Sequence, residues 1–95
     1  MGLFFSWDDR KAAANLRKHR ISFEEAATIF EDPLLITVPD KSHANGEERF
    51  FSIGQSRRGG LIAVAHTETG SRIRIISARK ATRLERRTYE EGKEF

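Results

Sequence analysis

The chain has 95 residues, contains no cysteine and carries a formal net charge of +3. A chain of this length supports one hydrophobic core, so we expect a single domain over residues 1–95, without disulfides or thiolate metal sites. No apolar run reaches the roughly 18 residues of a membrane span, and no cationic leader or cleavage-like site follows Met1, so a cytoplasmic protein is expected.

A first helix is predicted from about Asp8 to His19. Asp8 or Asp9 can cap the opening amides, and residues 11–18 are rich in good helix formers. Lys11, Asn15 and Lys18 share one stripe of this helix. The stripe predicts a polar, cationic side.

A second helix is predicted to start at Ser22. Ser22 and Glu25 have the spacing of a reciprocal capping pair, in which each side chain accepts from an amide of the other. Phe23 begins a run of apolar residues at helical spacing. Asp32-Pro33 ends the helix, because proline disfavours helical geometry in the residue before it.

Four strands are predicted in the middle of the chain. The apolar, β-branched runs lie at residues 34–38, 49–53, 61–66 and 72–77, and Gly-containing turns separate the last three. Alternation in the last strand places Ile73, Ser77 and Arg79 on one face and Arg72 and Arg74 on the other.

A basic closing helix follows, where Thr82 and Glu85 again have capping spacing. The fold class is therefore α+β: two N-terminal helices, an antiparallel sheet of about four strands and one C-terminal helix. The helices are expected to cover one face of the sheet.

Basic residues concentrate near the end of the chain. Between residues 72 and 87 only Glu85 is acidic, whereas the basic residues are Arg72, Arg74, Arg79, Lys80, Arg83, Arg86 and Arg87. Such a block attracts phosphates. A solvated face and a surface for an acidic protein partner remain alternatives.

Several short blocks, in order, resemble the BrnT family of toxins. They are Trp7-Asp8 with Lys11, Asn15 and Lys18-His19; Phe23-Glu24-Glu25-Ala26; Gly46 to Phe50; Ile53-Gly54; and Arg74 to Thr82, with Glu85-Arg86 and Tyr89. The resemblance covers about Trp7 to Glu91. One departure is Arg20, where members commonly have Gly, which suits a left-handed helix terminus.

The resemblance implies a fold related to RelE-type ribonuclease toxins, an RNA-cleaving activity that arrests growth, and neutralisation by a BrnA antitoxin. Such an antitoxin carries a DNA-binding domain, so the toxin is expected to reach operator DNA only through this partner, in a hetero-oligomer. No membrane association is implied.

Metal-free RNA cleavage requires a positioned 2′-hydroxyl, a proton acceptor and cations around the phosphorane. The sequence offers no paired carboxylates for Mg²⁺, and His19, His43 and His66 lack ligand spacing, so we expect neither metal nor cofactor. The predicted catalytic residues are Arg79, Arg49, Arg74, His19 and Lys18.

Each of these residues has a structural alternative. Arg79 can form an ion pair that ties strand to helix, Arg49 and Arg74 can bind acids of the body, and His19 can cap its helix or pack in the core. His66 is expected to pack in the sheet.

The predicted substrate-binding residues are Lys11, Lys80, Arg83, Arg86, Tyr89 and Trp7. Trp7 and Tyr89 can stack on bases, and the Tyr89 hydroxyl can also donate a proton. The alternatives are a core position for Trp7 and a solvated Lys11.

These cations are expected to converge on one pocket for a scissile phosphate. The predicted activity is a metal-independent endoribonuclease acting by 2′-hydroxyl attack. The alternative is a non-catalytic nucleic-acid-binding or co-repressor module that acts with a DNA-binding partner.

Overall fold

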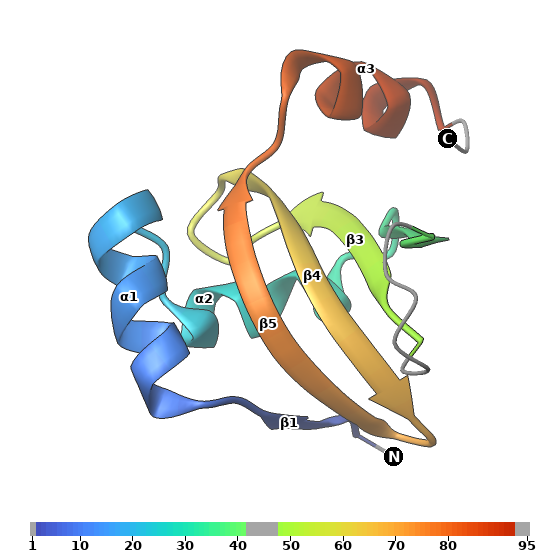
Figure 1. The fold of residues 1–95 in the computed structure, drawn as a ribbon. Coiled ribbons are helices and arrows are strands. Elements are labelled where there is room, and N and C mark those ends of the chain that lie inside the picture. The colour runs from blue at the N-terminus through green and yellow to red at the C-terminus, as the bar shows by residue number, and fades with distance from the viewer. Residues whose placement is uncertain (1, 42–47, 93–95) are drawn as a thin grey trace.

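The computed structural model describes residues 2–41 and 48–92 (Figure 1). Within them the helices are α1 (Asp9–His19), α2 (Phe23–Thr28), the 3-10 turn η1 (Ile29–Glu31) and α3 (Arg83–Glu91). The strands are β1 (Phe4–Ser6), β2 (Ile36–Pro39), β3 (Phe50–Gln55), β4 (Leu61–Thr69) and β5 (Arg72–Lys80). None of these helices is both long enough and apolar enough to cross a membrane. The expected α+β class, with two N-terminal helices and one C-terminal helix, is confirmed.

The five described strands form one sheet in the order β1-β5-β4-β3-β2. The pairs β2–β3, β3–β4 and β4–β5 are antiparallel, as predicted, whereas β1 runs parallel to β5. The strand β1 was not predicted, because three residues show no alternation and their pairing partner, Arg72 to Arg74, is far away in the chain. The predicted strand at 34–38 begins later, at Ile36, because Asp32 to Leu35 form a turn.

The helix starts follow the predicted capping chemistry with one difference. The Asp8 side chain accepts from the amides of Arg10 and Lys11 at the start of α1. Ser22 caps α2 by accepting from the Glu25 amide. The second hydrogen bond of the predicted pair, from the Ser22 amide to the Glu25 side chain, is not found in the described part of the chain. The Glu25 carboxylate accepts instead from the Ser56 hydroxyl at 2.8 Å.

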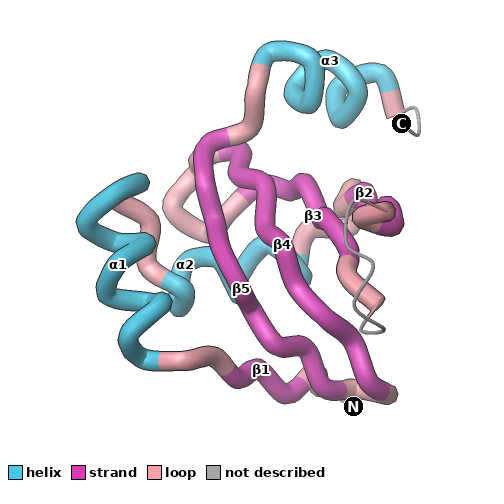
Figure 2. Tube along the Cα trace, in the orientation of Figure 1, coloured by secondary structure: helices cyan, strands magenta, loops and turns pink. Residues whose placement is uncertain are grey.

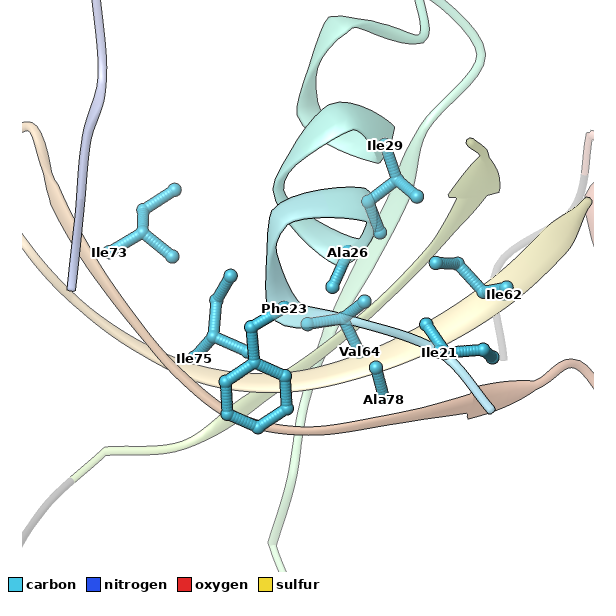
Figure 3. Packing of buried hydrophobic residues seen from close by; sticks show 9 residues of the cluster. All are labelled: Ile21, Phe23, Ala26, Ile29, Ile62, Val64, Ile73, Ile75 and Ala78. Atoms are coloured by element: carbon cyan, nitrogen blue, oxygen red, sulfur yellow. The ribbon is translucent and has the colours of Figure 1, made fainter. Parts of the chain in front are cut away.

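The main core lies between the sheet and the two N-terminal helices (Figure 3). Phe23, Ala26 and Ile29 point from α2 and η1 toward Val64 and Ile75 of the sheet, and all five side chains are buried. Burial of large side chains such as these stabilises a small domain by about 1.5–3 kcal/mol each. The amphipathic pattern of the second helix therefore sets how it packs on the sheet.

Asn15 is buried, although the stripe it shares with Lys11 and Lys18 predicted a polar face. Its amide nitrogen donates to the carbonyls of Ile21 and Ala78, and its amide oxygen accepts from the Ala78 amide at 3.0 Å. Ala78 lies on the edge of β5 beyond the short pairing with β1. Asn15 thus replaces a neighbouring strand there, a role that only the tertiary structure reveals.

The last helix lies apart from the other two. In Figure 2, α3 follows the end of β5 and sits beyond the sheet, away from α1 and α2. Thr82 and Glu85 form the predicted capping box at its start. A small second core, on the face of the sheet opposite α2, packs Ile53, Leu61 and Ala63 against Tyr89 of α3.

Candidate functional site

The two faces of the sheet differ in what covers them. α1 and α2 pack on the face that carries Val64 and Ile75 (Figure 1). The opposite face carries Arg79, which lies opposite Ala63 of β4 in the strand register. Only α3, among the described helices, packs on this face, at the end near Leu61. We call it the arginine face.

A β-bulge places Arg74 on the same face as Arg79. The register of β4 on β5 shifts between Ala65 and His66, which leaves Ile76 as an extra residue in β5. One extra residue reverses the alternation of side chains along a strand. The prediction that Arg74 and Arg79 point to opposite faces is therefore wrong, because a bulge leaves no mark in the alternating pattern.

Arg49 falls in one row with Arg74. The last pair of β3 and β4 is Phe50 with His66, and extending this register by one residue places Arg49 opposite Thr67, which pairs with Arg74 on its other side. Neighbouring strands are about 4.8 Å apart, so the two arginine backbones lie roughly 10 Å apart across Thr67. Two of the predicted catalytic arginines thus flank one short side chain.

Small side chains form the floor between this row and Arg79. The register places Thr67, Ala65 and Ala63 of β4 in succession on this face, with Ser77 beside Ala65. Four residues of strand separate Thr67 from Ala63, which corresponds to about 13 Å. Ala63, Ala65 and Thr67 are buried, and Phe51 of β3 lies beside Ala65 on this face, so the cations stand around a covered floor of small residues.

Arg79 forms the ion pair that was its structural alternative. Its two terminal nitrogens donate to the two carboxylate oxygens of Glu85 at 2.8 and 2.9 Å. The hydrogen bonds from Arg79 lower the pKa of Glu85, and those to Glu85 raise the pKa of Arg79. The guanidinium also lies 6.0 Å from the centre of the Phe51 ring. Arg79 is therefore held in place on the arginine face by α3 and β3.

The hydroxyl of Tyr89 is already engaged by the body of the protein. It donates to Asp32 Oδ2, which also accepts from the Gln55 amide. Burial and the hydrogen bond to Asp32 raise the pKa of Tyr89 to about 12. Burial alone would raise the pKa of Asp32, but hydrogen bonds from Gln55, Tyr89 and the Leu34 amide together lower it. Tyr89 thus anchors α3 to the turn before β2.

A second group of cations surrounds a hollow of about 420 Å³ at the end of the sheet. This hollow, which we call the end pocket, lies where the end of α1, the β3–β4 turn, the end of β5 and α3 meet. Its charged and titratable lining is His19, Arg20, Glu25, Arg58, Lys80 and Arg86. Of these, His19, Lys80 and Arg86 are residues that the sequence predicts for the site.

Arg20 and Arg58 line the end pocket but were not predicted as site residues. Arg20 stood out only as a departure from a glycine. Arg58 precedes Gly59-Gly60 in the turn between β3 and β4. Its position in a tight turn was the one sequence feature that could have pointed to it.

The other predicted residues lie elsewhere. Lys18 and Lys11 are exposed on α1, and Arg83 is exposed on α3. Trp7 packs in the core, where its ring meets Phe23 edge-on at 5.9 Å. Trp7 is half-buried against the core, which is the structural alternative given for it above.

His66 is buried on the helix-covered face, as predicted. Its Nε2 lies 2.7 Å from the Ser52 hydroxyl, which in turn lies 2.7 Å from the Thr37 hydroxyl. Phe30 packs against the ring edge-on at 5.0 Å. Burial lowers the pKa of His66 to about 4. His43 lies outside the described residues, and the described part contains no cluster of three or more His, Asp or Glu residues arranged for a metal ion.

The predicted cations therefore do not converge on one pocket within residues 2–41 and 48–92. Arg49, Arg74 and Arg79 share the arginine face, whereas His19 and Lys80 line the end pocket. Arg79 and Lys80 are consecutive in β5 and point to opposite faces, so the two groups meet at the end of that strand.

Known proteins share this architecture. A family model described as the ribonuclease toxin BrnT of type II toxin–antitoxin systems matches residues 7–85. The fold is similar to the 1.1 Å crystal structure of the Brucella abortus ribonuclease toxin BrnT, with a TM-score of 0.63 and 26% identity over 87% of this chain and 99% of that chain. No curated protein sequence matches.

Proposed function

Since the chain belongs to the BrnT family of ribonuclease toxins of type II toxin–antitoxin systems, we propose that it cleaves RNA on the arginine face without a metal ion. Membership of such a family implies a cognate antitoxin. We further propose that this partner is a DNA-binding protein of the BrnA kind, and that the toxin acts in the cytoplasm.

The observation that supports this site is the common face of Arg49, Arg74 and Arg79. The three were chosen from the sequence as phosphate ligands, and the bulge in β5 aligns them along one strip of small side chains. Guanidinium groups bind pairs of phosphate oxygens, and fixed cations stabilise the charge that develops on a phosphorane.

In the proposed reaction the 2′-oxygen attacks the adjacent phosphorus while its proton passes to solvent. The bond from phosphorus to the 5′-oxygen then breaks, and that oxygen takes up a proton from water. The products are a 2′,3′-cyclic phosphate and a 5′-hydroxyl. Arg49 and Arg74 would hold the phosphate oxygens across Thr67, whereas Arg79, which already binds Glu85, would border the RNA farther along the strip.

Two side chains proposed from the sequence have no proton-transfer role in this scheme. His19 lies in the end pocket rather than on the arginine face. Tyr89 donates its hydroxyl proton to Asp32 and has a pKa of about 12. Catalysis would therefore depend on positioning and electrostatic stabilisation more than on general acid–base chemistry.

The test is incubation of the purified protein with RNA in excess EDTA, followed by analysis of the product ends. We expect cleavage with 2′,3′-cyclic phosphate and 5′-hydroxyl ends. Cleavage that requires added Mg²⁺, or that yields 5′-phosphates, would contradict the metal-free route.

Inducible expression in cells separates the enzyme from the non-catalytic alternative. We expect growth arrest with RNA degradation, relieved by co-expression of the antitoxin. Intact RNA and normal growth would instead indicate a nucleic-acid-binding or co-repressor module.

A further inference from the structure

The end pocket holds more positive charge than its surroundings neutralise. Arg20, Arg58, Lys80 and Arg86 line it, and Glu25 is its one acidic side chain. The carboxylate of Glu25 accepts from the Ser56 hydroxyl at 2.8 Å. The four cations therefore face one hollow together with a single carboxylate.

Two neighbouring arginines outside the pocket, unlike those inside it, form ion pairs. Arg57 donates twice to Glu31, at 2.7 and 2.8 Å, and Arg79 binds Glu85. Among the described residues, no side-chain acceptor or salt bridge is found for the four pocket cations. Like charges gathered around a concave surface raise the local concentration of anions.

Arg20 occupies the pocket at a cost in backbone energy. Its φ is 61°, in the left-handed region, and it is the one residue other than glycine with positive φ among the described residues. A side chain there is disfavoured, and glycine would take the same conformation without strain. Arg20 ends α1 as its left-handed C-cap, and its side chain lines the end pocket.

We propose that the end pocket binds a backbone phosphate of the RNA, a few nucleotides away from the one that is cleaved. This inference rests on the proposed function and extends it with a second phosphate subsite. Arg79 and Lys80 are consecutive and point to opposite faces, so an RNA strand that crosses the end of β5 passes from the arginine face into the pocket. Arg20 and Arg86 bind the phosphate there, from α1 and α3.

The experiment measures binding of a 2′-O-methyl RNA, which cannot be cleaved, at several salt concentrations. The variants are Arg20→Gly, Arg86→Gln and the double variant, and the matched control is Arg57→Gln, which removes one arginine outside the pocket. We expect about tenfold weaker binding by the double variant. The slope of log affinity against log salt should fall by roughly 0.7 per lost phosphate contact, while the control keeps the slope of the unmodified protein.

Arg20→Gly gives a second readout with the opposite sign. Relief of the left-handed strain should raise the melting temperature by a few degrees while RNA affinity falls. A variant that lost affinity because it was damaged would melt earlier. An unchanged affinity with a raised melting temperature would overturn the assignment of Arg20 to an RNA contact.

The remaining outcomes distinguish other ligands of the pocket. Unchanged RNA binding by all pocket variants overturns the proposal. If RNA binding is unchanged but binding of the antitoxin weakens, the pocket is a protein interface, and if inorganic phosphate alone binds, it is a free-anion site; both results overturn it. If the protein binds RNA through the pocket but cleaves none, the proposed function fails and this subsite stands.

Discussion

Acidification should destabilise the protein through His66 between pH 6.5 and about 5. The ring is fully buried, lies between Phe30 and Phe50, and places Nε2 2.7 Å from the Ser52 hydroxyl. The Glu68 carboxylate lies 3.6 Å from Nδ1. Burial lowers the pKa of His66 from 6.5 to about 4, and a hydrogen bond with the Thr67 backbone opposes this shift only in part. The folded protein therefore keeps this histidine neutral.

The sign of the effect follows from where the proton binds. Above pH 6.5 His66 is neutral in both states and stability does not depend on it. As the pH falls from 6.5 toward 4, the unfolded chain takes up a proton that the folded protein excludes, so the free energy of unfolding decreases. The loss is about 2 kcal/mol at pH 5 and approaches roughly 3 kcal/mol below pH 4.

Urea unfolding at pH 7.5, 6.5, 5.5 and 5.0 measures this loss, with His66→Gln as the comparison. The variant is less stable at pH 7.5, but its free energy of unfolding should change less across the range, by about the 2 kcal/mol assigned to His66. Parallel pH profiles for the two proteins, or an NMR titration of His66 with a midpoint near 6.5, would refute the reasoning.

Two further predictions concern stability. Asn15→Ala should lower the free energy of unfolding by about 3 kcal/mol in urea, because it removes three hydrogen bonds and leaves the Ala78 amide and carbonyl unpaired; a loss below about 1 kcal/mol would show that water replaces the side chain. Gly54→Ala should cost about 1–3 kcal/mol, since an added Cβ would lie 3.2 Å from both the Cβ and the carbonyl oxygen of Ile29, besides 2.9 Å from the flexible end of Leu35. The matched control Gly60→Ala meets nothing closer than 3.9 Å, so equal melting temperatures for the two variants would contradict the steric argument.

Local chemistry predicted the elements well. Asp8 and Thr82 cap their helices as expected, and the three strands of the meander lie where alternation and turn residues placed them. Signals of this kind act within a few residues, so they are visible in the sequence. The parallel strand Phe4–Ser6 escaped because only its distant partner makes it a strand.

The candidate site was harder to predict, since it depends on register and on contacts between distant segments. Arg74 joins Arg79 on one face only because Ile76 is bulged, which alternation cannot show. Asn15 lies on a polar stripe but is buried against Ala78. Composition therefore identified the cations, and the tertiary structure divided them between two surfaces.

The most direct measurement is the single-turnover rate of RNA cleavage in EDTA by Arg74→Gln and by Arg57→Gln, with the stability of each protein checked by thermal unfolding. Each variant removes one exposed guanidinium, but only Arg74 lies on the arginine face. We predict that Arg74→Gln cleaves about 100- to 1,000-fold more slowly than the unmodified protein, and that Arg57→Gln cleaves at the same rate as the unmodified protein. Cleavage by a folded Arg74→Gln protein at the unmodified rate would contradict the assignment of the scissile phosphate to the arginine face.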